Sequence, residues 1–485
     1  MLILLLILLP FFGGLLIWLL QAKAARGLAL LTSLLTMCTA LVSYFFYSSN
    51  QHWNELSVNH AWIETLGARF NMALHPGDGL ALMMVLLTSI GFPFIFLYQL
   101  NKDQDRPKTF YSLMLWVQSG LLGVFLAKDA LLFYIFWEVA LIPVYFLASM
   151  YGGERRKAVS FKFFIYTFSG SLLMLLGLLY VYIQTPIHSF DWDSMLSAGK
   201  AIPATTQHIL FWFMFVAFAI KMPVFPFHTW QPDAYEESAA PVTMVLSAFM
   251  VKMGLFAVVR WLMPVVPEAA SFWMNLVIAL SVCGIVYASL MALVQTNLKR
   301  MLAYSSIAHI GLMCAAIFSH QLLGMQGAAI QMFNHGITIL GLWMLGGIIE
   351  QRLQTQDMRS MGGIASVAPW FSVMLVVLSL ANIALPLTNG FIGEFMMFNG
   401  LFESTSKYHM LFTVIAGIGI ILSAVYTLGM IQKVIFGEAR YNGNLFTDLT
   451  WNEKLVLGLI VAGVLILGFY PKVLMDLIYV ETIFK

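Results

Sequence analysis

The chain contains 485 residues, of which 60% are hydrophobic and only 10% are charged. Soluble proteins average about 45–50% apolar and about 25% charged residues, so this composition excludes both a water-soluble fold and a disordered chain. The 25 basic and 23 acidic residues give a net charge of only +2, and the densest basic run is too short to predict nucleic-acid binding. The sequence predicts an integral membrane protein embedded in a lipid bilayer.

Fourteen stretches are long and apolar enough to cross a membrane, which takes about 20 residues per helix. They run over 1–20, 27–48, 78–100, 109–127, 130–150, 158–183, 206–230, 240–263, 270–294, 299–319, 322–350, 366–401, 408–436 and 453–479. The long polar connections are 49–77, 184–205 and 437–452. We therefore predict an all-α, polytopic bundle of about 14 transmembrane helices that forms a single membrane domain over residues 1–485.

The first apolar stretch has no basic residue before it, so we expect a retained helix and not a secretory signal peptide. Lys and Arg are instead concentrated on alternate connections, including Lys23, Arg26 and the run 155–157. Cytoplasmic loops of membrane proteins carry such an excess of positive charge. With an even number of spans, both termini are predicted on the non-cytoplasmic side.

Three ionisable residues of the first half fall inside predicted spans, where each charge is costly and usually lines a polar path or has a partner. Glu138 follows Trp137, and Lys221 ends an apolar run just before two prolines that break the helix in mid-span. Lys252 lies one span further on. Because a buried lysine readily changes its pKa, both lysines are candidate proton carriers.

The second half contains a counterpart of this broken helix. Span 366–401 is interrupted by Pro386 and two glycines and is followed at once by Glu394, so we expect Glu394 and Lys221 to occupy related positions. Paired interrupted helices are typical of inverted repeats. We predict a first repeat over 109–263 and a second over 270–436, with flanking helices in 1–100 and 453–479.

Two histidines lie between these charged positions, His309 in span ten and His335 in span eleven. Histidine is the side chain whose ordinary pKa lies nearest neutrality. Ser305 and Ser306 share the helical face of His309, and Thr338 stands three residues after His335. This pattern predicts a hydrogen-bonding stripe through the bundle. The alternative is that these buried ionisable residues only form structural pairs that join helices.

The three cysteines, Cys38, Cys283 and Cys314, lie far apart in apolar stretches and offer neither a CxxC pair nor an iron–sulfur ligand pattern. His, Cys and carboxylate residues do not recur at metal-ligand spacing on one helix. There is also no phosphate-binding loop and no GxGxxG fingerprint. We expect this chain to bind no metal or cofactor and to perform no redox chemistry itself.

Five motifs resemble the antiporter-like, proton-translocating membrane subunits of respiratory complex I, the NADH:quinone oxidoreductase. They are the WE pair at 137–138, KMPVFPFHTWQPDA at 221–234, LKRMLAYSSIAHIG at 298–311, FNHG at 333–336 and LPLTNGFIGEF at 385–395. The resemblance implies a fourteen-helix subunit with two inverted five-helix repeats. Most sibling subunits carry lysine at the position of Glu394. A glutamate at this position is typical of one particular antiporter-like subunit.

The resemblance also implies roles for individual residues. Glu138 and Lys221 would be the coupled pair of the first half-channel, Lys252 and His335 the central relay, and Glu394 the exit, with His309 beside His335 on the same proton path. NADH, FMN, iron–sulfur clusters and quinone are expected in partner subunits. Sibling antiporter-like subunits are expected on either side, in the cytoplasmic membrane of a bacterium.

Three other functions fit some of the same residues. The family includes Mrp-type cation/proton antiporter subunits, and it has relatives in membrane-bound hydrogenase complexes. A sodium-dependent antiporter would transport without an electron donor. A non-transporting scaffold would tolerate neutral replacement of every relay residue, and the cost of burying those residues counts against it.

Overall fold

The structure is a computed structural model that describes residues 1–49, 53–440 and 446–478. Within these ranges thirteen helices are long and apolar enough to cross a membrane. They are α1 (Leu2–Leu19), α2 (Ala22–Ser48), α3 (Gly79–Tyr98), α4 (Pro107–Leu126), α5 (Ala130–Met150), α6 (Arg156–Gln184), α8 (Ala204–Lys221), the continuous segment Ala240–Val265, α13 (Pro267–Val294), α14 (Leu298–Phe318), α15 (Leu322–Leu353), α19 (His409–Ile435) and α20 (Trp451–Phe469). Residue 479, at the end of the last predicted span, lies outside the described residues.

The remaining predicted span, 366–401, is divided into two half-helices, α17 (Pro369–Asn382) and α18 (Asn389–Phe402). The predicted membrane bundle is therefore confirmed, and the interruption contains Pro386 as expected. Gly390 and Gly393 do not interrupt the chain, because both lie within α18. Short helices complete the connections: α7 (Trp192–Ala201), α9 (Gln231–Glu237), α16 (Ile364–Val367) and α21 (Lys472–Met475), with 3-10 turns η1 (Trp53–Leu56), η2 (Glu64–Leu66) and η5 (Met358–Ser360).

The polar connection 49–77 contains a structure that the sequence analysis did not predict. Strands β1 (Ser57–Ile63) and β2 (Ala68–Ala73) pair antiparallel, with Ser57 opposite Ala73. Gly67 turns the chain between them with φ of 62°, a left-handed conformation that glycine adopts without strain. The bundle is thus mostly helical, with one small hairpin outside the apolar segments.

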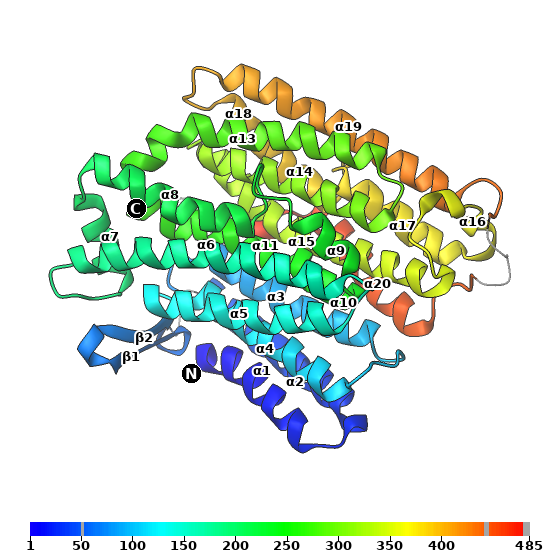
Figure 1. The fold of residues 1–485 in the computed structure, drawn as a ribbon, viewed down its shortest axis with the longest axis horizontal. Coiled ribbons are helices and arrows are strands. Elements are labelled where there is room, and N and C mark those ends of the chain that lie inside the picture. The colour runs from blue at the N-terminus through cyan, green and yellow to red at the C-terminus, as the bar shows by residue number, and fades with distance from the viewer. Residues whose placement is uncertain (50–52, 441–445, 479–485) are drawn as a thin grey trace.

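The helices are arranged so that the histidine-bearing ones lie in the middle. Figure 1 shows α1 and α2 along one edge and α13 and α19 along the opposite edge. The apolar stretches of α14 and α15 are completely buried, whereas those of α19 and α20 are mostly exposed. Exposed apolar helices face lipid in a membrane protein, while helices that are apolar and buried form its core. His309 and His335 therefore lie deep inside the bundle.

Two helix breaks interrupt this core. α8 ends at Lys221, residues 222–230 form turns, and the indole Nε1 of Trp230 donates a 2.9 Å hydrogen bond to the carbonyl of Ile220. The second break separates α17 from α18. Lys221 is the last residue before the first break, whereas Glu394 lies in the second turn after the second break. The two residues thus stand on opposite sides of their breaks, and our expectation of related positions is corrected in this respect.

Candidate functional site: a buried chain of ionisable side chains

The centre of the bundle contains a direct contact between a lysine and a histidine. Lys252 Nζ lies 3.0 Å from His335 Nδ1 and donates a 2.7 Å hydrogen bond to the carbonyl of Ser247. Lys252 has no exposed surface, and His335 has only 3%. An ammonium group can donate to the deprotonated Nδ1, so a proton on Lys252 has an acceptor within hydrogen-bonding distance.

The backbone around Lys252 is adapted to this contact. The segment Ala240–Val265 consists of α10 (Ala240–Val245), α11 (Val251–Ala257) and α12 (Met263–Val265), joined by two π-helical segments. These are η3 (Leu246–Met250) and η4 (Val258–Leu262), and they flank the short α11 that carries Lys252. Such wide turns are rare and occur mostly at functional sites. Here the carbonyl of Ser247, within η3, accepts from the lysine side chain.

Two further contacts extend the chain away from Lys252. The rings of His335 and His309 lie with their centroids 5.4 Å apart. His309 Nδ1 then lies 3.1 Å from Glu394 Oε1, and each of these two residues is only 7% exposed. Lys252, His335, His309 and Glu394 therefore form a row of neighbouring ionisable side chains, drawn from α11, α15, α14 and α18. Within it the two imidazoles are in ring contact, and Nε2 of each has no hydrogen-bond partner among the described residues.

Polar residues that the sequence analysis did not single out surround the outer end of this row. Ser305 Oγ accepts hydrogen bonds from the hydroxyl of Tyr426 at 3.0 Å and from Asn382 Nδ2 at 3.1 Å. A cavity of about 20 Å³ adjoins His309, Glu394 and Tyr426. This volume is sufficient for a single water molecule. The predicted stripe thus exists at Ser305, and its partners come from helices that the sequence does not connect with it.

The second helix break is fixed to α15 by a pair of asparagines. Asn334 Nδ2 donates to the carbonyl of Asn389 at 2.6 Å, and Asn389 Nδ2 donates to the carbonyl of Asn334 at 3.2 Å. Thr338 Oγ1 also donates to Asn389 Oδ1 at 3.3 Å. Asn389 begins α18, so these bonds attach the start of the half-helix that carries Glu394 to α15. The only sequence signal was the asparagine in each of the two motifs.

Glycines allow α15 and α18 to approach closely. A side chain added to Gly400 would overlap Gly324 Cα, and one added to Gly327 would come within 2.8 Å of the backbone nitrogen of Met397. These positions leave no room for any larger residue. Close backbone contact therefore holds Glu394 at the depth of His309.

The Glu138–Lys221 pair lies apart from this row. Both carboxylate oxygens of Glu138 and Nζ of Lys221 are buried, and none has a hydrogen-bond partner at normal distance among the described residues. The two groups interact electrostatically without a direct ion pair, and the ring of Trp137 lies 5.5 Å from Lys221 Nζ. α8, which ends at Lys221, packs directly on α11, which carries Lys252. A Cβ added to Gly254 of α11 would lie only 2.8 Å from the carbonyl oxygen of Phe218 in α8.

A second charged cluster, which we call the Asp78 triad, consists of Asp78, Lys128 and Arg260. Asp78 Oδ2 lies 2.5 Å from Lys128 Nζ, and Asp78 Oδ1 lies 2.9 Å from a guanidinium nitrogen of Arg260. Burial and the nearby Arg260 lower the pKa of Lys128 to about 8. Burial alone would raise the pKa of Asp78, but the two cations outweigh it and lower that pKa. The sequence contained no signal for this cluster, since its members are 50 and 182 residues apart.

Ion pairs also fix α9, the short helix after the first break. Asp233 lies 3.1 Å from Arg300 of α14 and 2.9 Å from Lys162 of α6, and Glu236 lies 2.7 Å from Arg300. These pairs attach the broken segment to both neighbouring helices. Elsewhere in the described ranges, no three His, Cys, Asp or Glu residues converge in a group that could hold a metal ion.

Comparison with known proteins places these features in context. The family described as NADH:quinone oxidoreductase/Mrp antiporter, transmembrane region, matches residues 127–422. NADH-quinone oxidoreductase subunit M of Rickettsia typhi is 34% identical over 95% of this chain and 93% of its own length. NADH-quinone oxidoreductase subunit M of Escherichia coli K12 is 33% identical over 97% of this chain and 95% of its own length. A chain of respiratory complex I from Thermus thermophilus with bound NADH superposes over 100% of both chains, with a TM-score of 0.89 and 27% identity.

Proposed function

This chain belongs to the NADH:quinone oxidoreductase/Mrp antiporter family of membrane subunits, and from this premise we propose that it moves protons along a relay of six buried side chains. It is an antiporter-like, proton-translocating membrane subunit of an NADH-quinone oxidoreductase. The relay residues are Glu138, Lys221, Lys252, His309, His335 and Glu394.

The observation that supports this relay most directly is the row of side chains from Lys252 to Glu394. Its two closest contacts are 3.0 Å for Lys252 Nζ to His335 Nδ1 and 3.1 Å for His309 Nδ1 to Glu394 Oε1. A transferable proton needs a donor and an acceptor at such distances, directly or through one water. Structural pairing alone does not require two titratable imidazoles in sequence between a lysine and a carboxylate.

The chemistry of each step is a proton transfer between side chains. Lys252 gives a proton to Nδ1 of His335 and becomes a neutral amine. His335, protonated on both ring nitrogens, can then release a proton toward His309. His309 in turn passes a proton from Nδ1 to the carboxylate of Glu394, whose Oε1 lies 3.1 Å away. Each residue returns to its starting state when the next proton arrives.

Coupling to the first half of the chain is electrostatic. At about 4 Å and an effective dielectric constant of about 20, two unit charges interact by about 4 kcal/mol. The Glu138–Lys221 interaction is weaker than that limit because the two groups form no direct pair among the described residues. A proton that leaves Lys221 still changes the field at Lys252, since their helices are in contact. We propose that this change drives the proton from Lys252 onward.

The proposed role of Glu138 and Lys221 can be tested in the purified complex reconstituted into liposomes. Glu138→Gln and Lys221→Met should abolish the share of proton translocation that passes through this subunit while the complex still assembles. Glu403→Gln and Lys407→Met, at exposed positions, are the matched controls and should leave translocation unchanged. Full proton translocation in Glu138→Gln or Lys221→Met would contradict the relay.

Several finer features belong to the same proposal. We infer that NADH, FMN, iron–sulfur clusters and quinone are bound by partner subunits, so that this chain contributes to the translocase without redox chemistry of its own. Sibling antiporter-like subunits adjoin it on either side. The chain has two inverted repeats, 109–263 and 270–436, and both termini on the non-cytoplasmic side of a bacterial membrane. Sodium transport by the isolated chain without an electron donor would favour an Mrp-type antiporter instead.

A further inference from the structure

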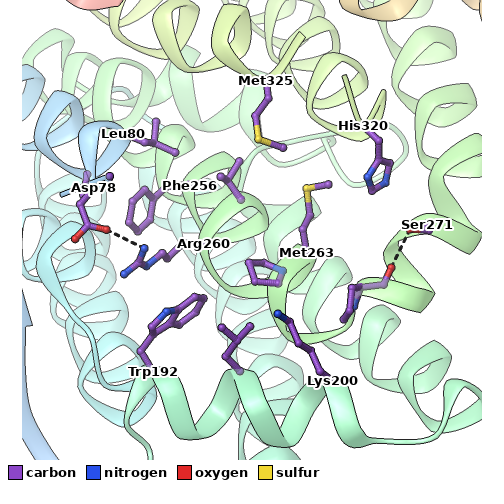
Figure 2. Close-up of a pocket in the computed structure, with 16 residues that line it drawn as sticks. Asp78, Leu80, Trp192, Lys200, Phe256, Arg260, Met263, Ser271, His320 and Met325 are labelled. Carbon is purple, nitrogen blue, oxygen red and sulfur yellow. Dashed lines mark hydrogen bonds and ion pairs between the residues drawn. The ribbon is translucent and has the colours of Figure 1, made fainter. Parts of the chain in front are cut away.

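A pocket that no relay residue lines lies at one end of the bundle. It has a volume of about 240 Å³, and Figure 2 shows Asp78 from the beginning of α3, Trp192 from α7, and Phe256 and Arg260 from the central helix around it. Lys200 and Ser271, which also line it, are exposed, so the pocket meets the surface. This end of the bundle carries the connections that the charge asymmetry predicts to be non-cytoplasmic.

Three walls of this pocket are helices that also hold the Lys252–His335 pair. α11 lines it with Phe256, one helical turn after Lys252 and about 6 Å further along the axis. α15 lines it with Met325 near its beginning and carries His335 further along. α3 lines it with Leu80 and, deeper in the bundle, places Leu87 against Gly336, the neighbour of His335. The helices that line the pocket therefore lead from it toward Lys252.

The Asp78 triad fixes the wall of this pocket. Arg260 is held by Asp78 at 2.9 Å and lies 4.5 Å from the ring of Trp192, so its cation stands in a defined place about two turns beyond Lys252. Phe256, which is 2% exposed, lies between Lys252 and Arg260 along the helix and separates Lys252 from the pocket by an apolar side chain.

We propose that this pocket is a release vestibule for protons that reach Lys252, a second exit besides the one at Glu394. In the release step the ammonium of Lys252 gives one proton to a water molecule in the pocket. The products are a neutral amine and a hydronium ion that passes to bulk water, and the relay then returns a proton to the amine. Phe256 limits back-flow, because water must pass its ring to reach Lys252. This inference rests on the proposed function of the relay.

The test uses the whole complex with a cysteine placed in the pocket wall. Leu196 of α7 lines the pocket, whereas its neighbour Ser197 is exposed and does not line it. Leu196→Cys and Ser197→Cys are made in a background with Cys38→Ser and Cys283→Ser, since those two native cysteines are exposed. Each purified complex is treated with a bulky, charged methanethiosulfonate, reconstituted, and assayed for protons moved per NADH oxidised. Mass spectrometry measures the labelled fraction.

We expect labelling of Leu196→Cys to lower the proton-to-electron ratio to a value between that of the untreated complex and that of a Lys252→Met complex, because the exit at Glu394 stays open. Labelled Ser197→Cys should keep its untreated ratio. A cysteine at 196 that resists the reagent, or a fully labelled one with an unchanged ratio, overturns the vestibule. If Lys252→Met itself pumps normally, the proposed relay fails together with the vestibule. If Lys252→Met fails to pump but labelled Leu196→Cys pumps normally, only the vestibule is wrong.

Discussion

His309 Nδ1 lies 3.1 Å from Glu394 Oε1, although the two residues belong to different helices and are 85 positions apart in a chain whose core is almost entirely apolar. Each side chain is only 7% exposed. A buried ionisable group is costly unless it has a partner, and each of these two residues has the other as its partner. At this distance a proton can pass directly between the imidazole and the carboxyl group.

This relationship predicts the behaviour of Glu394→Gln. Glutamine retains the shape of the side chain but, unlike a carboxylate, cannot take up a proton from His309. A barrier that rises by only about 1.4 kcal/mol slows a transfer step about tenfold. We expect proton translocation by the reconstituted complex to fall about tenfold or more. Glu403→Gln, at an exposed position near the end of the same helix, serves as the control; equal rates in the two variants would contradict the prediction.

Lys252 can be tested as a proton carrier by a substitution that keeps its charge. Lys252→Arg retains a cation near His335, but a guanidinium remains protonated throughout the accessible pH range. We expect a complex that assembles and oxidises NADH with lost or severely reduced proton translocation. Lys102→Arg is the control, because Lys102 lies outside the row and 3.7 Å from Glu453. Normal pumping by Lys252→Arg would show that Lys252 acts only as a fixed charge.

The close approach of α15 and α18 predicts a position-specific effect of one methyl group. Gly400→Ala would overlap Gly324, and overpacking of this kind typically costs about 1–3 kcal/mol. We expect lower thermal stability of the purified complex and slower proton translocation, because α18 also carries Glu394. Gly417→Ala is the matched control, since a Cβ there meets nothing within 4 Å. Identical melting of the two variants would exclude the tight crossing.

The Asp78 triad predicts a pH dependence of stability that originates at Lys128. Its pKa is about 8 in the folded chain, against 10.5 for an ordinary lysine. Below pH 8 the lysine is charged in both the folded and the unfolded chain. Between pH 8 and 10.5 the unfolded chain binds more protons than the folded one. The free energy of unfolding therefore rises with pH through this window, by at most about 3 kcal/mol. The gain is complete above the ordinary pKa and is lost as the pH falls through about 8.

This effect is measured by melting the wild-type and Lys128→Met complexes at several pH values from 7 to 10. The difference in stability between them should change in favour of the wild type as the pH rises, because methionine has no proton to lose. Lys407→Met, which removes an exposed lysine, should show the same pH dependence as the wild type. Parallel curves for wild type and Lys128→Met would contradict the lowered pKa.

Much of the fold could be predicted because membrane insertion constrains the sequence directly. Every predicted span corresponds to a helix or to a broken pair of helices, and the break after Lys221 lies where prolines follow it. The hairpin β1–β2 was not predicted, because its short alternating strands are bounded by polar residues that also suit a loop. The related positions expected for Lys221 and Glu394 were corrected, because Lys221 precedes its break and Glu394 follows its own. A break in each half therefore does not by itself make two charged residues equivalent.

The sequence by itself determined that the chain is a helical membrane bundle with a few costly charges inside it, because hydropathy over about 20 residues and the cost of burying a charge are local properties. Only the tertiary structure decided which of those charges meet. Lys252 is 83 residues from His335, and Arg260 is 182 residues from Asp78. Contacts over such separations depend on how helices cross and rotate, and these are set by packing at sites such as the glycines between α15 and α18.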